Sequence, residues 1–329
     1  MKKSFAILCS AAFISLSASA AIPDGYYDSL EGKCGTELMR AAKDAVRTHK
    51  VISYGSSTWD CFKTTDYIMV DGRKAWWDMY SNNIVYVRDG HEGLNIEHSV
   101  ANSWWGKTKN DAYKDLFHLN PSDATANNRK SNYPLGEVGT VTWTNGPTTV
   151  GKPVSGQGGG CANVFEPADE YKGDFARAFM YIFTVYNDIT WKENTAWMYD
   201  TANTRLFKPW AIQLLLKWSD NDPVDEKETN RNEAIYGFQT NRNPFIDHPD
   251  LAHYIWGDKN TTPWYADGSG VDEIELEEME ISVSDGCITA PDGARVFDLG
   301  GRECSREALQ PGIYIVAKPG AKTVKVIVR

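Results

Sequence analysis

The sequence predicts an α+β protein in which a large, mostly helical region precedes a small all-β module. Apolar residues recur at helical spacing in several stretches before residue 264, whereas residues 280–329 alternate with period two. Between these regions, residues 265–285 contain eight acidic residues and no basic residue, a composition typical of a solvated linker. We therefore expect a folded region at 21–264, an acidic linker at 265–279 and a β module at 280–329.

Individual elements of the first region can be placed from their spacing. Three apolar stripes each lie on one face of a predicted core helix: Leu38, Ala41, Ala42, Ala45 and Val46; Phe175, Phe179, Ile182 and Tyr186; Leu206, Trp210, Leu214 and Trp218. Residues 67–70, 84–87 and 141–143 are predicted strands, and Asp71-Gly72 is a predicted turn.

The β module should contain four or five short strands. Residues 287–290, 294–299, 312–316 and 324–328 alternate between apolar and polar positions, with Gly300-Gly301 and Pro311-Gly312 at turns.

The first twenty residues have the pattern of a secretory signal peptide. Lys2 and Lys3 precede an apolar stretch, and Ala18-Ser19-Ala20 provides small residues for cleavage, so the mature chain should begin near Ala21. No other apolar run approaches the ~20 residues that a membrane-spanning helix needs. We expect a secreted or surface protein without a membrane span.

Five cysteines remain in the mature chain, and an oxidising compartment would favour disulfides between them. By proximity in the sequence, Cys34 pairs with Cys61 and Cys287 pairs with Cys304, which leaves Cys161 over. The sequence leaves the connectivity open.

Three polar segments carry the chemistry. They contain Glu97-His98, then Asp115 to Leu119, and then Asn127 to Gly136. An imidazole such as His98 can accept a proton from water near neutral pH. The oxygens of Glu97 and Asn127 suit Mg²⁺, which keeps several of its waters and takes few protein ligands. This combination indicates metal-assisted hydrolysis of phosphodiesters. Adjacent strand residues point to opposite faces, so Glu97 and His98 can share a site only where a strand ends.

These segments resemble the endonuclease I family of secreted bacterial nucleases, of the ββα-metal or His-Me finger class. Further blocks at 26–32, 215–223 and 241–249 are also similar, so the resemblance covers most of residues 22–258. It implies a nuclease domain built on a ββα-metal motif, with His98 as general base and with Glu97 and Asn127 as ligands of one Mg²⁺. It also implies products with 5′-phosphate and 3′-hydroxyl ends. The chain has Phe117 where the family commonly has histidine.

Other residues of the three segments have predicted supporting roles. Arg129 and Lys130 are expected to contact substrate phosphates, against the alternative of solvated surface. His118 and Asp115 are expected to support the residues of the site, and ordinary packing is the alternative for His118. The net charge of −10 disfavours a general attraction to nucleic acid, so binding would need a local basic patch and a bound cation.

The sequence thus predicts a secreted, Mg²⁺-dependent endonuclease without sequence specificity, a monomer whose main substrate is DNA, with RNA as a possible second substrate. Mn²⁺ or Ca²⁺ could replace Mg²⁺. The tail resembles the C-terminal sorting domain of type IX secretion substrates, which implies a Gram-negative source and contact with the secretion machinery; a small binding module is the alternative. One alternative for the whole chain is a noncatalytic surface protein that binds polysaccharide or nucleic acid and holds a structural Ca²⁺. A zinc phosphoesterase is another.

Overall fold

The chain divides into two compact units, Met1–Ala266 and Asp267–Arg329, in a computed structural model. The structure describes residues 22–192, 197–200, 205–268, 279–318, 321 and 323–328. The predicted signal peptide at 1–20 and most of the predicted acidic linker at 265–279 lie outside the described residues. Within the described part, none of the helices is both long and apolar enough to span a membrane.

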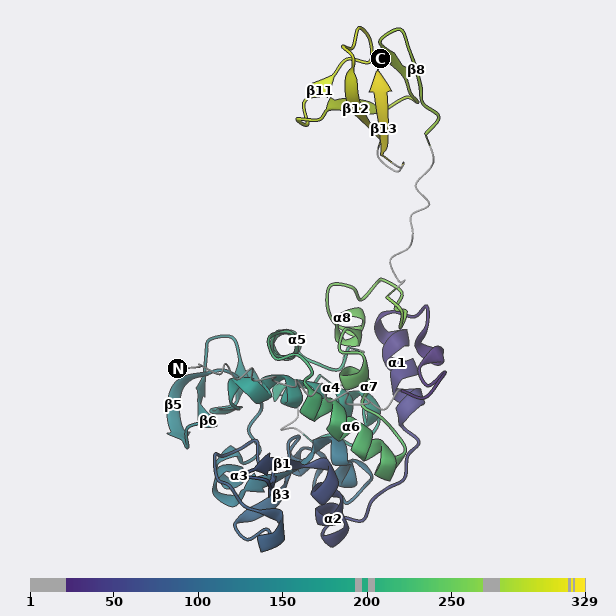
Figure 1. The fold of residues 1–329 in the computed structure, drawn as a ribbon. Coiled ribbons are helices and arrows are strands. Elements are labelled where there is room, and N and C mark those ends of the chain that lie inside the picture. The colour runs from purple at the N-terminus through teal and green to yellow at the C-terminus, as the bar shows by residue number, and fades with distance from the viewer. Residues whose placement is uncertain are drawn as a thin grey trace, which may run out of the picture. The chain divides into compact units, whose positions relative to one another are not determined.

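The larger unit contains the helices, and α4 is its central element. Eleven of the fourteen residues of α4 are buried, so the helix is covered on all sides, as expected for a core helix. It packs against α1, α5 and α7 (Figure 1). The helices among the described residues are α1 (Gly35–Val46), α2 (Ser56–Thr65), α3 (Ala124–Lys130), α4 (Lys172–Val185), α5 (Pro209–Asn221), α6 (Glu226–Gln239), α7 (Pro244–Asp247) and α8 (Leu251–Ile255).

The strands described in the larger unit form three small antiparallel sheets. They are β1 (Tyr67–Val70) with β2 (Arg73–Trp76), β3 (Leu94–His98) with β4 (Leu119–Asp123), and β5 (Val138–Thr144) with β6 (Thr149–Pro153) and β7 (Val164–Glu166). The predicted turn joins β1 to β2, because Asp71 and Gly72 both have positive φ, as a tight hairpin turn requires.

The predicted strand at 84–87 is wrong. Only Tyr86 pairs with a strand residue, through an isolated bridge to Ala75, because a short 3-10 helix begins at Val87 and ends the extended conformation. The three predicted core helices are confirmed as α1, α4 and α5. Leu206, the first residue of the third predicted stripe, is not helical, because α5 begins only at Pro209 and Leu206 has a φ of 67°. The unit is therefore α+β, with several small separate sheets rather than one continuous sheet among its described residues.

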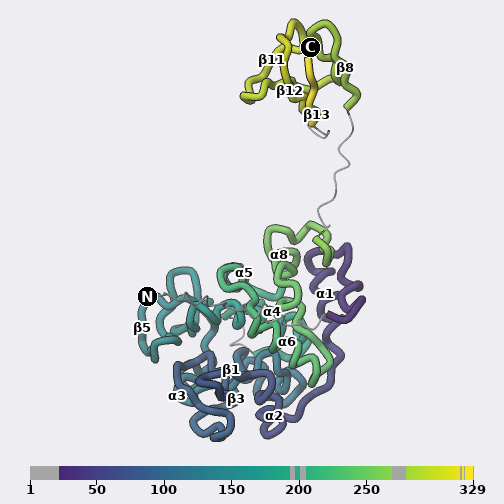
Figure 2. Tube along the Cα trace, viewed as in Figure 1, coloured from purple at the N-terminus to yellow at the C-terminus, as the bar shows by residue number. Residues whose placement is uncertain are grey.

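The smaller unit is all β, as predicted. It contains β8 (Ser282–Ser284), β9 (Cys287–Thr289), β10 (Arg295–Asp298), β11 (Glu303–Cys304), β12 (Gly312–Ala317) and β13 (Val324–Val328). The last four form one antiparallel sheet in the order β11-β10-β12-β13. Figure 2 shows the course of the chain through this unit and labels β11, β12 and β13. Val326 and Val328 are buried while Ile327 between them is exposed, so the period-two alternation correctly indicated a sheet with one covered face.

The predicted disulfides are not formed in the structure. The five cysteines of the described residues, including Cys34, Cys61, Cys287 and Cys304, are all free. Cys34 precedes α1, whereas Cys61 is buried on α2. In the smaller unit, the Cys304 thiol donates a hydrogen bond to the carbonyl of Arg302. Proximity in the sequence, on which the predicted pairs rested, does not bring these thiols together.

Candidate active site

The site is assembled by the β3–β4 pair and the helix that follows it. In this antiparallel pair, Glu97 lies opposite Asn120 and His98 lies opposite Leu119. Helix α3 starts directly after β4, and the Asp123 side chain caps it by accepting a hydrogen bond from the Ala126 N–H. Helix α3 packs against both strands. Two short strands and one capped helix therefore bring residues thirty positions apart in the sequence to one place.

One surface pocket contains the three residues predicted to carry the chemistry. Strand β3 ends at His98, which allows the adjacent Glu97 and His98 to face the same space, as expected. The pocket has a volume of about 320 Å³. It is lined by Glu97, His98, Ala101, Asn102, Ser103, Lys107, Asn127, Ser131 and Asn132.

The imidazole of His98 is held in a defined tautomer. Its Nε2 lies 3.0 Å from the carbonyl oxygen of Tyr113, and because a carbonyl can only accept, Nε2 must carry the proton. Nδ1 is then the basic nitrogen, and the amide Nδ2 of Asn102 donates to it at 3.3 Å. The rings of Tyr54 and Tyr113 pack on the imidazole. Burial lowers the pKa of His98 to about 4, so the ring is neutral at physiological pH.

The carboxylate of Glu97 forms a buried ion pair. Lys130 Nζ lies 2.8 Å from Glu97 Oε1, and both side chains are nearly inaccessible to solvent. Burial raises the pKa of Glu97, and the neighbouring Lys130 opposes this shift. Lys130 was predicted to contact substrate phosphate, but it is completely buried. The prediction for Lys130 is wrong because its ammonium points inward, to Glu97 and to the carbonyl of His98.

Asn127 completes the group of oxygen donors. It lies on α3, lines the pocket, and its side chain hydrogen-bonds to Glu97. A carboxylate and an amide oxygen at the wall of a pocket suit Mg²⁺, whereas Zn²⁺ prefers nitrogen and sulfur ligands. The described residues contain no cluster of three or more His, Cys, Asp or Glu side chains that could hold a metal. Two oxygen donors, one from Glu97 and one from Asn127, are of the kind that Mg²⁺ accepts while it keeps most of its waters.

Comparison with known proteins assigns the family. The model of the endonuclease I family matches residues 34–250, well over half of the chain. The chain belongs to the endonuclease I family. It is similar to the extracellular ribonuclease of Bacillus subtilis (strain 168), with 31% identity over 245 residues that cover 71% of this chain and 78% of that protein. Its similarity to the extracellular ribonuclease of Bacillus amyloliquefaciens is also 31% over 245 residues, which cover 70% and 78%.

As a member of this family, the chain is an enzyme that hydrolyses phosphodiester bonds. The alternative of a noncatalytic surface protein is wrong. The matched residues 34–250 include β3, β4 and α3, so the pocket lies within the part of the chain that defines the family.

Behind the pocket of the nuclease, Asp115 and His118 are both buried. The Asp115 carboxylate accepts hydrogen bonds from the hydroxyls of Tyr181 and Tyr186 on or next to α4 and from the Gln239 amide. The described contacts of Asp115 are therefore with the core rather than with the pocket residues. The ring of His118 lies edge-on to that of His98, with 5.3 Å between centroids, and its Nε2 donates to the carbonyl of Ala112 at 2.7 Å.

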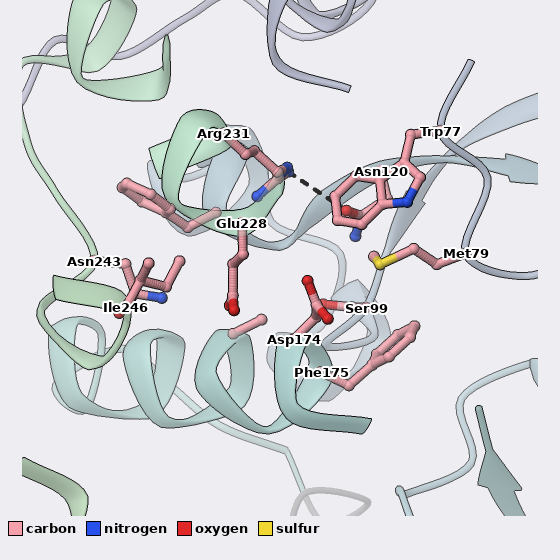
Figure 3. A pocket seen from close by; sticks show the side chains of 12 residues that line it. Trp77, Met79, Ser99, Asn120, Asp174, Phe175, Glu228, Arg231, Asn243 and Ile246 are labelled. Atoms are coloured by element: carbon pink, nitrogen blue, oxygen red, sulfur yellow. Dashed lines mark hydrogen bonds between the residues drawn. The ribbon is translucent and has the colours of Figure 1, made fainter. Parts of the chain in front are cut away.

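Sequence reasoning missed the residue that fixes β4. Arg231 on α6 donates 2.8 Å hydrogen bonds to the carbonyls of Leu116 and Leu119, and a longer one to the Asn120 side chain (Figure 3). Its Nε also donates to Asp66 at 2.7 Å. An arginine on a polar helix carries no sequence signal for this role. Beside Arg231 lies a cavity of about 20 Å³ that Ser99 and Asp174 help to line (Figure 3), enough for a single water molecule.

Arg129, the other residue predicted to contact phosphate, does not line the pocket. Arg129 is exposed on α3, with its guanidinium 5.9 Å from the ring centroid of Trp143 on β5. Residues two apart on a helix do not share a face, so Arg129 points away from the side of α3 that presents Asn127. Lys107, by contrast, lines the pocket and was not singled out from the sequence.

Proposed function

We propose that the protein is a secreted, Mg²⁺-dependent endonuclease without sequence specificity, in which His98 is the general base and Glu97 and Asn127 are the protein ligands of the cation. The observation that carries this proposal is the convergence of these three side chains on one pocket. The order β3, β4, α3, with base and first ligand on β3 and second ligand on α3, supports a ββα-metal motif.

The proposed role of His98 follows from its hydrogen bonds. With Nε2–H held by the Tyr113 carbonyl, Nδ1 offers its lone pair toward the pocket. Nδ1 takes a proton from the water that attacks phosphorus. The hydrogen bond from Nε2–H to the Tyr113 carbonyl stabilises the imidazolium that forms. The Asn102 amide, which donates to Nδ1 at 3.3 Å, holds the ring in place. The attacking water replaces this hydrogen bond at Nδ1. Neutral His98 is ready for this step at physiological pH because burial holds its pKa low.

The proposed ligands are prepared by their neighbours. Lys130 stabilises the ionised form of Glu97, and Asn127 donates to the same carboxylate. A bound Mg²⁺ would supply positive charge for the phosphate and for the departing oxygen. Mn²⁺ or Ca²⁺ could take its place, since both accept carboxylate and amide oxygens.

Water as the nucleophile bears on which nucleic acids can be substrates. This route needs no 2′-hydroxyl, so we propose DNA as the main substrate and RNA as a further one. The resemblance to the endonuclease I family implies 5′-phosphate and 3′-hydroxyl ends. The relatives are named ribonucleases, which supports RNA as a substrate. A ribonuclease that used the 2′-hydroxyl as nucleophile would instead leave cyclic phosphates on RNA and spare DNA.

Secretion is proposed on three grounds. The first twenty residues have a signal-peptide pattern, both relatives are named extracellular, and the β unit resembles a sorting domain. We propose that this unit directs export across the outer membrane of a Gram-negative bacterium through type IX machinery, and that the mature enzyme acts as a monomer.

The test compares the wild type with His98→Ala and Glu97→Ala on plasmid DNA and on a defined RNA, with Mg²⁺ or with chelator. Both variants should lose activity, by roughly 10²- to 10⁴-fold for removal of a general base. His98→Ala should bind Mg²⁺ as the wild type does, whereas Glu97→Ala should bind it more weakly. End-labelling should find 5′-phosphates on both substrates. Wild-type rates in His98→Ala, or undiminished cleavage in chelator, would refute the proposal.

A further inference from the structure

One cation in the pocket has no role in the chemistry described above. Lys107 is the only lysine or arginine among the nine described residues that line the pocket. Its side chain is exposed. Within the described part of the chain, Lys107 Nζ has no ion-pair partner within 4.0 Å. Lys130 cannot serve in its place, since its charge is paired with Glu97 inside the protein.

The backbone holds Lys107 in a conformation that lysine rarely adopts. Gly106 and Lys107 are both left-handed, with φ of 74° and 60°. The Lys107 N–H donates to the carbonyl of Asn102 at 2.9 Å, which ties this turn to a residue that contacts His98. The φ of Gly106 favours glycine there, whereas a Cβ would meet only the flexible end of the Lys192 side chain. Unfavourable backbone at a non-glycine residue beside a reactive group is typical of functional positions.

A second polar group of the pocket also lacks a partner. The hydroxyl oxygen of Ser103 is buried, lines the same pocket, and forms no hydrogen bond with the described residues. A buried hydroxyl without a partner is unfavourable unless a ligand or water supplies one. The Ser103 hydroxyl is out of reach of a substrate, so the exposed ammonium of Lys107 is the donor that can meet a phosphate oxygen here.

The charge of the whole chain makes such a local cation necessary. With a net charge of −10, the protein as a whole repels a polyanion, and nucleic-acid affinity must come from individual phosphate contacts. Arg129 and Lys130, the predicted contacts, do not line the pocket. The short basic run around Lys107 also contains Lys109, which is exposed but outside the pocket lining.

We propose that Lys107 binds a non-bridging oxygen of a substrate phosphate at the pocket. This inference rests on the proposed function of the pocket. Lys107 is a positioning residue that holds the phosphodiester in reach of His98 Nδ1. Its contact is with the backbone of the nucleic acid, so it acts equally on all base sequences.

Three variants test the role of the charge. Lys107→Asn removes the cation while retaining a residue that tolerates positive φ, and Lys107→Arg restores a cation. Lys109→Asn is the matched control, an exposed lysine two positions away. The measurements are KM and kcat for cleavage of a short DNA duplex at several salt concentrations, Mg²⁺ affinity, and the thermal midpoint.

Lys107→Asn should raise KM by about tenfold or more, as expected for loss of a charged contact. The slope of log(kcat/KM) against log[salt] should become less steep by about one phosphate contact. Mg²⁺ affinity and thermal midpoint should match the wild type, and Lys107→Arg should recover most of the loss. Lys109→Asn should change KM by less than Lys107→Asn.

The outcome separates this inference from the proposed function. If the wild type cleaves DNA with Mg²⁺ and depends on His98, but Lys107→Asn keeps the wild-type KM and salt slope, the Lys107 contact is wrong and the catalytic proposal stands. If KM rises equally in the Lys109 control, the effect is general electrostatics and the specific contact is refuted. If the wild type shows no metal-dependent cleavage, the proposed function fails first.

Discussion

Replacing Lys130 with methionine should destabilise the nuclease unit and do so through Glu97. The two charges are 2.8 Å apart, and their side chains are only 1% and 9% exposed. At that distance the attraction is on the order of 6 kcal/mol with an effective dielectric constant of 20. Part of this energy offsets the cost of removing both ions from water. Removing one partner of such a pair leaves the other buried without compensation, which typically costs about 3–5 kcal/mol.

The assay is urea unfolding at pH 7 in chelator, followed by tryptophan fluorescence. Lys130→Met should lower the free energy of unfolding by about 3–5 kcal/mol. The double variant Glu97→Gln, Lys130→Met should recover much of this loss, because it removes the uncompensated carboxylate.

An exposed pair provides the control for this prediction. Lys63 Nζ lies 2.7 Å from Asp60 Oδ1, but the side chains are 54% and 67% exposed, so Lys63→Met should cost less than about 1 kcal/mol. The reasoning would be refuted by a Lys130→Met protein as stable as the wild type. It would also be refuted if the double variant were no more stable than the single one, since the cost would then come from packing rather than from the charge of Glu97.

Two further predictions concern the pH profile and the second unit. Because burial lowers the pKa of His98 to about 4, the base is neutral above about pH 5. The kcat/KM at saturating Mg²⁺ should therefore be level from about pH 5.5 upward and fall as the pH drops through about 4, and an acid limb near the ordinary histidine pKa of about 6.5 would show that His98 is not so deeply buried. A protein ending at Ala266, where the first compact unit ends, should fold and cleave DNA at the wild-type rate after purification. A truncated protein that fails to fold would mean that the second unit belongs to the catalytic fold.

Part of the fold was predictable because it rests on local periodicity. The apolar stripes of α1, α4 and α5 and the alternation in β10, β12 and β13 correspond to elements whose burial repeats along the chain. The turn at Asp71-Gly72 was also readable, since its residues tolerate positive φ. The strand at 84–87 was not, because four β-prone residues do not reveal that a 3-10 helix interrupts them.

The residues that carry the proposed chemistry could likewise be predicted from their types and their order in the sequence. Glu97, His98 and Asn127 were singled out from the sequence, and the structure places all three on one pocket. What neighbouring residues do there depends on direction, which the sequence does not carry. Lys130 and Arg129 are adjacent basic residues, yet one is completely buried and the other is exposed. Successive residues of a helix differ by about 100° in direction, so only the packing of α3 decides which of them faces Glu97.

The tertiary structure alone decided the contacts between distant segments. Arg231 meets the carbonyls of Leu116 and Leu119 across more than a hundred residues, and Asp115 meets the hydroxyls of Tyr181 and Tyr186. It also decided that the predicted cysteine pairs do not meet, and that Lys107 lies in the pocket through a left-handed turn. Periodicity and residue type are local properties of the chain. The direction of a side chain and its partner arise only when the packed core fixes how the elements lie against one another.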